Sequence, residues 1–293
     1  MSTEETAAEG LLADWIELTK PRITLMVLLT AGIGMLLAAP GMLPFELIVA
    51  TLSGTWLVAA GSASLNHAYE HQLDSKMERT ANRPVAAGRM SAATAVIFGL
   101  ILGSGGLALL AWKVNLISAI LGAVAFVSYV VIYTPLKMRS SLSTVVGAVP
   151  GALPPMMGWT AVTGEIQPGA WALFGILFLW QMPHFLAIAW MCREDYARAG
   201  FPMLPVVQPE GHSTALQMVL YSVALIPVSL APTALGLAGW GYFCGALAVG
   251  LLYLWASIDF SKRRTDEAAR RVLMVSVVYL PAVLGVLAID RLL

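Results

Sequence analysis

Long apolar runs separated by short polar connections make up most of the chain. An apolar run of about 20 residues is long enough to cross a bilayer as a helix. Nine such runs occur, at residues 22–40, 45–65, 92–112, 114–133, 144–163, 168–190, 214–236, 239–259 and 272–290. The pattern predicts an all-α, polytopic membrane protein whose nine helices belong to one domain over residues 1–293, with a polar segment at 1–20.

The composition agrees with this prediction. The chain is 58% hydrophobic and 12% charged, whereas soluble domains carry about 25% charged residues. Gly, Ala and Ser are frequent in the apolar runs, and small residues allow membrane helices to pack closely. No basic, aromatic-rich soluble region is present, which argues against nucleic acid as a partner. Membrane lipid is the expected surrounding.

The basic residues predict the orientation of the helices. Of the 17 Lys and Arg residues, 15 lie in the N-terminal segment or in the connections after the second, fourth, sixth and eighth runs. Only Lys113 and Arg291 lie on the opposite side. Positive charge is enriched on the cytoplasmic side of a membrane. We therefore expect a multi-pass protein of the cell (inner) membrane, with its N-terminus in the cytoplasm and its C-terminus outside.

The polar stretch after the second run carries the strongest chemical signal. Asn66, Glu70 and Asp74 are spaced four residues apart, so on a helix their side chains share one face, about 6 Å apart along the axis. Oxygen ligands of this kind suit Mg²⁺, which usually shares them with substrate phosphates. Arg79 and Arg83 follow closely and are suited to hold the same phosphates. The stretch predicts a Mg²⁺–diphosphate site facing the cytoplasm.

Two histidines flank this stretch with the same spacing. His67 and His71 are four residues apart, and a helical pair of this kind can bind a transition metal. No third nitrogen or sulfur ligand accompanies them, and the oxygen ligands favour Mg²⁺ instead.

A second polar cluster lies at the end of the fourth run. Tyr133, Lys137 and Arg139 are candidates for binding diphosphate oxygens, with Lys137 also a candidate catalytic residue. The alternative is an interfacial belt, because Tyr, Lys and Arg favour membrane edges in proteins of any function.

A third cluster begins inside the sixth run. Pro183 would free a carbonyl group there, and His184 beside it is an ionisable residue at membrane depth, which makes it a functional candidate. The alternative for His184 is a neutral side chain hydrogen-bonded between helices. Glu194 and Asp195 follow the run and are candidates for a second metal-binding arm, or else solvated loop carboxylates.

Together these clusters resemble the UbiA superfamily of intramembrane prenyltransferases. The first motif of that family, Asn-Asp-x-x-Asp-x-x-x-Asp, is similar to Asn66-His67-x-x-Glu70-x-x-x-Asp74, with His for one Asp and Glu for another. Three stretches place the match nearest to the farnesyltransferases that act on haem: Asp74 to Pro84, Trp180 to His184, and Asp195 to Val206. The second Asp-rich motif of the family is weak, because its outer positions fall on Cys192 and Tyr196.

The resemblance implies a fold, a reaction and a set of partners. It implies nine helices around a central cavity, open to the cytoplasm and laterally to lipid. It implies that haem B, farnesyl diphosphate and water are converted to haem O and diphosphate with Mg²⁺ as cofactor. In that reaction His184 would orient the haem. The product would pass to a haem A synthase or a terminal oxidase.

Two other functions fit parts of the pattern. Another superfamily member would prenylate a quinone precursor or a chlorophyllide, but the Trp180–His184 and Pro202–Val206 stretches argue against it. A transporter would place its carboxylates near the bilayer centre, often within inverted repeats. Here the charges lie at one face and no repeat is evident.

Overall fold

The computed structural model describes residues 3–292, with side chains for residues 10–291, and this part of the chain contains helices and no strands. The helices are α1 (Thr3–Leu18), α2 (Pro21–Ala38), α3 (Phe45–Asp74), α4 (Ala92–Lys113), α5 (Leu116–Val127), α6 (Thr134–Lys137), α7 (Ser143–Thr163), α8 (Pro168–Met191), α9 (Arg193–Ala199), α10 (Leu204–Val207), α11 (His212–Ala234), α12 (Trp240–Arg263) and α13 (Asp266–Leu292). A π-helical turn, Ser128–Tyr133, joins α5 to α6.

Nine helical segments of the described chain are long and apolar enough to cross a membrane, which confirms the expected multi-pass fold. The fourth of them runs without a break through α5, the π-helical turn and α6, from Leu116 to Lys137. Large apolar side chains stay exposed along the outer faces, for example Leu25, Ile101 and Leu251. A lipid environment covers such faces at no cost in apolar hydration.

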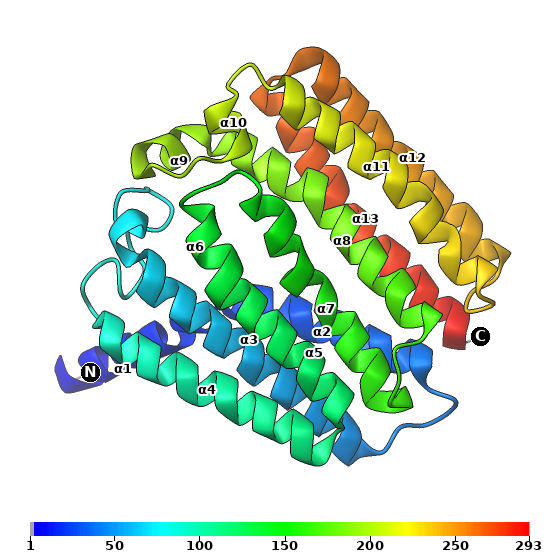
Figure 1. The fold of residues 1–293 in the computed structure, drawn as a ribbon, viewed down its shortest axis with the longest axis horizontal. Helices are drawn as coiled ribbons and strands as arrows, with labels where there is room; N and C mark the ends of the chain where they lie inside the picture. The colour runs from blue at the N-terminus through cyan, green and yellow to red at the C-terminus, as the bar shows by residue number, and fades with distance from the viewer. Residues whose placement is uncertain (1–2, 293) are drawn as a thin grey trace.

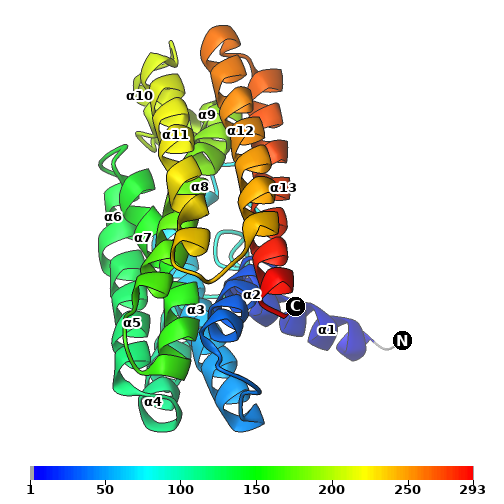
Figure 2. The ribbon, with the colours of Figure 1, turned by 90° about the vertical axis from the view of Figure 1, so that its right-hand side faces the viewer.

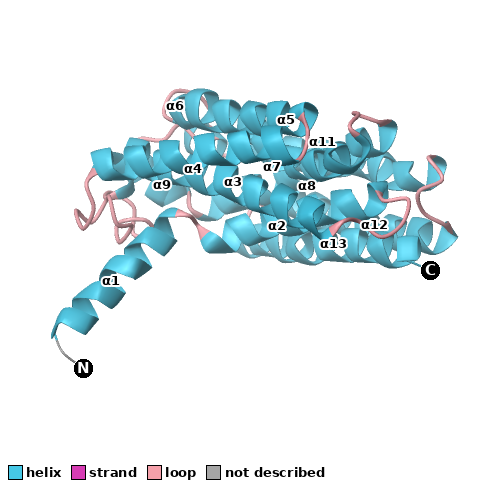
Figure 3. Cartoon of the chain, turned by 90° about the horizontal axis from the view of Figure 1, so that it is seen from below, coloured by secondary structure: helices cyan, strands magenta, loops and turns pink. Residues whose placement is uncertain are grey.

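The helices form two groups that lie side by side (Figure 1). One group contains α2 to α7 and the other contains α8, α11, α12 and α13, with α7 packed against α8 where the groups meet. Helix α1 projects away from the bundle at one end (Figures 2 and 3). It is fastened there by Trp15, whose ring packs edge-on against Phe98, and by an ion pair between Asp14 and Arg89.

Small residues bring particular helices into backbone contact. A Cβ atom on Gly61 of α3 would lie 2.6 Å from the backbone nitrogen of Gly103 in α4. A Cβ on Gly34 of α2 would overlap the carbonyl group of Pro155 in α7, and one on Gly158 would overlap the carbonyl group of Ala31. These contacts exclude any larger side chain and fix α3 against α4 and α2 against α7.

Several helix boundaries differ from the expected ones. The second span does not end near residue 65, because α3 continues as one helix to Asp74 and carries the first polar motif within it. The seventh span begins at His212 rather than at residue 214, and the ninth begins at Asp266 rather than at residue 272.

The contact between α2 and α7 yields a test of the packing. We expect Gly34→Val to destabilise the protein by about 1–3 kcal/mol, since the added carbons overlap the backbone of α7. The matched control is Gly32→Val, because a Cβ on Gly32 meets no atom within 4 Å. Thermal unfolding of both variants in one detergent measures the difference. Equal melting temperatures would contradict the close contact.

Candidate active site

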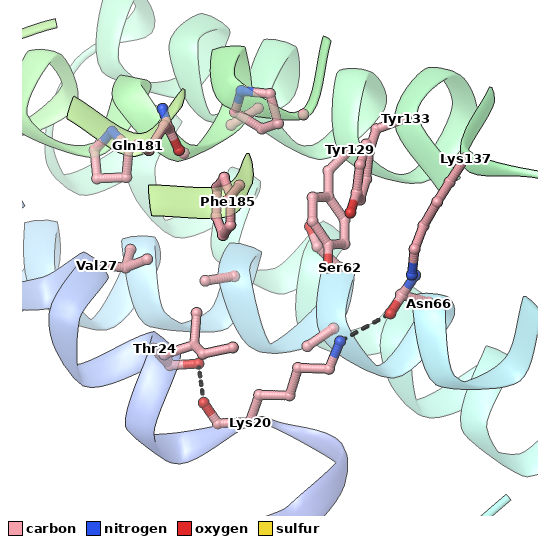
Figure 4. Close-up of a pocket in the computed structure, with 18 of the residues that line it drawn as sticks. Lys20, Thr24, Val27, Ser62, Asn66, Tyr129, Tyr133, Lys137, Gln181 and Phe185 are labelled. Atoms are coloured by element: carbon pink, nitrogen blue, oxygen red, sulfur yellow. Dashed lines mark hydrogen bonds between the residues drawn. The ribbon is translucent and has the colours of Figure 1, made fainter. Parts of the chain in front are cut away.

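A cavity of about 410 Å³ lies among α2, α3, α7, α8 and the segment from α5 to α6 (Figure 4). The α3 residues that line it share one helical face and are Thr55, Val58, Ala59, Ser62, Ala63, Asn66 and Glu70. The cavity is polar at the Glu70 end and mostly apolar towards Thr55. It therefore offers charged groups and an apolar compartment in one continuous space.

The polar end is built around the predicted oxygen ligands. Asn66 and Glu70 line the cavity, and Asp74 lies one helical turn beyond them; their exposed fractions are 3%, 1% and 1%. Each carboxylate is paired with a cation from another segment. Lys137 donates to Glu70 Oε2 at 2.8 Å, and Arg83 donates to Asp74 Oδ2 at 2.6 Å. The structure thus brings four of the predicted residues into direct contact.

Lys20, which precedes α2, also reaches this end of the cavity. Its Nζ donates a hydrogen bond to Asn66 Oδ1 at 2.8 Å (Figure 4). Its backbone has φ of 48°, in the left-handed region, directly before Pro21 at the start of α2. Burial, and next to it the positive charge of Arg83, lower the pKa of Lys20 to about 7.

Aromatic side chains complete the polar end. Arg79 donates to Tyr196 Oη at 2.8 Å, and its guanidinium lies 5.0 Å from the centre of the same ring. Tyr129 and Tyr133 line the cavity from the π-helical turn, with ring centres 5.2 Å apart. The ring of Tyr133 packs onto Gly147, where a Cβ would lie only 2.6 Å from it.

Two carboxylate oxygens at this end have no hydrogen-bond partner among the described residues. They are Glu70 Oε1 and Asp74 Oδ1, and both are buried. Buried acceptors are normally satisfied, so free oxygens here fit a cation. Mg²⁺ is usually bound by one or two carboxylates together with substrate phosphates. Glu70 and Asp74 therefore fit Mg²⁺ shared with a phosphate ligand, whereas Asn66 Oδ1 accepts the hydrogen bond from Lys20 and stays a predicted ligand.

The two histidines of α3 have different surroundings. Within the described part of the chain, no group of three or more His, Cys, Asp or Glu side chains gathers to hold a metal. His71 Nδ1 is hydrogen-bonded to Ala68 O, whereas both ring nitrogens of His67 are buried and have no partner in the described part of the chain.

Five predicted residues do not line the cavity: Asp74, which lies one turn beyond Glu70, and Arg139, His184, Glu194 and Asp195. Glu194 is exposed on α9, and Asp195 is paired with Arg198. Arg139 follows α6, and its side chain is likewise absent from the cavity wall. A second metal-binding arm at Glu194 and Asp195, and diphosphate binding by Arg139, stay predictions.

His184 points to a neighbouring helix instead of into the cavity. Its Nδ1 is hydrogen-bonded to Ser276 Oγ of α13 at 2.7 Å, and its ring stacks on Trp180 with centres 5.0 Å apart. Helix α8 continues through Pro183, and Tyr253 of α12 donates to the carbonyl of Trp180 near this point. These contacts favour the interhelical alternative for His184.

Two residues of the site were not anticipated as part of it. In the sequence analysis Lys20 served only as one of the basic residues that predict the orientation of the helices. Its position beside Pro21, at the polar edge of the first span, could have indicated a place in the site. Tyr129 lies four residues before Tyr133, but a π-helical turn was needed to place both rings at the cavity.

Comparisons with known proteins agree with this geometry. Residues 27–278 match the model of the UbiA prenyltransferase family. The chain is 47% identical over 289 residues to the protoheme IX farnesyltransferase of Solibacter usitatus (strain Ellin6076), covering 96% of this chain and 99% of that protein. It is 45% identical over 280 residues to the protein of the same name from Salinibacter ruber (strain DSM 13855 / M31), covering 96% and 99%.

Solved structures share the fold at low sequence identity. A digeranylgeranylglyceryl phosphate synthase superposes with a TM-score of 0.81 at 18% identity, covering 96% of this chain and 98% of the other. A UbiA homologue from Archaeoglobus fulgidus bound to GPP and Mg²⁺ superposes with a TM-score of 0.64 at 16% identity, covering 94% and 99%. The family match, the full-length relatives and the shared fold together establish that this chain belongs to the UbiA prenyltransferase family.

Proposed function

We propose that this protein is a protoheme IX farnesyltransferase, which converts haem B, farnesyl diphosphate and water to haem O and diphosphate. The observation that carries the proposal is a pair of buried carboxylates at the cationic end of an apolar cavity, where Glu70 lines the wall and Asp74 lies one turn beyond. Each has one oxygen without a partner among the described residues. Full-length relatives of that name support the choice of haem as acceptor.

The polar end is suited to hold and release a diphosphate group. Arg79, Arg83 and Lys137 are placed to bind phosphate oxygens, with Lys20 beside them. Mg²⁺ held by Asn66, Glu70 and Asp74 would supply the charge that neutralises a diphosphate leaving group. The cations aimed at the same oxygens stabilise the negative charge that grows on the diphosphate as its bond to C1 of the farnesyl chain breaks.

The apolar part of the cavity protects the reacting carbon chain. The bond electrons leave with diphosphate, and the allylic cation at C1 forms a bond to the terminal carbon of a haem vinyl group. Water then adds to the inner vinyl carbon and a proton is released, giving a hydroxyethylfarnesyl substituent. The walls around Val27, Ala59 and Phe185 exclude water from the early cation.

We place the polar end on the cytoplasmic side of the membrane, with the N-terminus inside and the C-terminus outside, and we treat residues 1–293 as one domain. The support is the distribution of Lys and Arg between the two sides. Handover of haem O to a haem A synthase or a terminal oxidase stays a prediction.

The metal assignment predicts a large loss of activity in a carboxylate variant. We expect Asp74→Asn to lower haem O formation by about 10²-fold or more, because it removes the free oxygen and the charge that would hold Mg²⁺. Liquid chromatography of haem pigments, with gel filtration to check folding, measures this. Excess EDTA should have the same effect on the unmodified protein.

The control for this experiment is Glu194→Gln, which changes an exposed carboxylate outside the cavity. It should retain activity if α3 alone supplies the protein ligands. Loss of activity in this control would support metal binding by Glu194 and Asp195. Full activity of Asp74→Asn in EDTA would contradict a metal-dependent reaction.

The orientation is testable with single cysteines. In a variant with Cys192 and Cys244 replaced by Ser, we expect Ser75→Cys to react with a membrane-impermeant thiol reagent only from the cytoplasm. We expect Glu165→Cys to react only from outside. Both positions are exposed and three spans separate them. Labelling of both from one side would refute the proposed topology.

The role of His184 is testable by its contact with Ser276. We expect His184→Ala and Ser276→Ala each to lower stability by about 1 kcal/mol with haem O formation retained, because each removes the same interhelical hydrogen bond. The double variant should be little worse than either single one. A loss of haem affinity without a loss of stability would instead assign His184 to haem binding.

A further inference from the structure

The apolar end of the cavity has a closed floor. Val58 and Met157 line the cavity there and belong at the same time to the main buried cluster of the bundle, with Leu110 and Leu153. Both are almost fully buried. Thr55, which lines the cavity about one turn further along α3, is buried as well and ends the lining face of that helix.

The contact between α2 and α7 closes the same end from a second direction. Val27 of α2 and Pro154 of α7 line the cavity. One turn further along each helix, Ala31 and Gly158 are in backbone contact. No chain can pass between the two helices below this level.

Helix α3 provides a scale for the depth of the cavity. Along its lining face, Ala59, Val58 and Thr55 precede Asn66 by 7, 8 and 11 residues. At about 1.5 Å per residue these positions lie roughly 10, 12 and 16 Å from the level of Asn66. The α3 lining residues between Asn66 and Val58 are small, namely Ala59, Ser62 and Ala63, so α3 itself does not narrow the channel before the floor.

The lengths of prenyl chains differ on the same scale. An extended carbon chain advances roughly 1.25 Å per bond. The main chain of a farnesyl group is therefore about 14 Å long, that of a geranyl group about 9 Å, and that of a geranylgeranyl group about 19 Å. With C1 held near Asn66, a farnesyl chain ends between Val58 and Thr55, whereas a geranylgeranyl chain would extend past the floor.

We propose that the lining face of α3, closed by Val58, Thr55 and Met157, selects the length of the prenyl chain and restricts the donor to about 15 carbons. This inference rests on the proposed function for its haem acceptor, but the length limit itself is a property of donor binding. The orphaned hydroxyl of Thr55, buried at the floor without a partner among the described residues, marks where the channel ends.

The test shortens the channel at a chosen depth. We expect Ala59→Phe to block it at about 10 Å from Asn66, which leaves room for a geranyl chain only. The ratio of kcat/KM for geranyl over farnesyl diphosphate should rise at least tenfold, because a pocket discriminates by about tenfold or more for each misfitting carbon group. Prenylated haem is measured by liquid chromatography with mass spectrometry.

A matched control and a milder variant keep the test decisive. Ala108→Phe makes the same substitution on an exposed position of α4 and should leave the ratio unchanged. Ala59→Leu repeats the test with less added volume, in case Ala59→Phe fails to fold. Mg²⁺-dependent binding of inorganic diphosphate should be retained in both Ala59 variants, since the polar end is not altered. An unchanged ratio in a folded Ala59 variant would overturn the proposal.

The unmodified protein supplies an independent outcome. Calorimetric titration with geranyl, farnesyl and geranylgeranyl diphosphate in Mg²⁺ requires no acceptor. Binding should increase from geranyl to farnesyl and fall at least tenfold for geranylgeranyl; equal binding of the last two would overturn the length limit. If the length preference is present but haem is never prenylated, only the proposed haem acceptor fails. If haem O forms without a length preference, only the length limit fails.

Discussion

The arrangement of this protein depends on burying two carboxylates inside a membrane bundle. A buried charge is expensive unless it is paired, and removing one partner of a buried pair costs more than the pair contributes. Glu70 and Asp74 are therefore tied to Lys137 and Arg83, which come from different connections of the chain. These ion pairs hold α6 and the connection after α3 to one face of α3, and so define the polar end of the cavity.

The cavity itself results from where the helices do not pack closely. Glycines press α3 onto α4 and α2 onto α7, and these contacts leave the opposite face of α3 directed at α7 and α8 across open space. That face changes from carboxylates to small and then apolar side chains within one helix. A single continuous helix thus relates the position of a diphosphate group to the depth of an apolar channel.

Sequence patterns predicted the features that depend on one helix at a time. The nine apolar runs predicted the spans, because a bilayer requires each segment to satisfy its own backbone. The spacing of Asn66, Glu70 and Asp74 predicted their common face. Features that depend on several helices were missed: Lys20 meets Asn66 only through packing of α2 on α3. Helix α8 has no distinct polar face. The sequence pattern therefore did not indicate that His184 faces α13 rather than the cavity.

The balance of charges at the polar end explains why a chain with no net charge can attract an anionic substrate. Arg79, Arg83 and Lys137 outnumber the two carboxylates there, so this end is locally positive. The acidic Asp14 and Glu17 of α1 are paired with Arg89. A positive cavity with low-dielectric walls concentrates anions. Among the described residues, one oxygen of each carboxylate has no partner, while the other oxygen is paired with a cation. The same cations therefore stabilise the buried carboxylates and remain adjacent to any phosphate that enters, so binding requires no new charge to be buried alone.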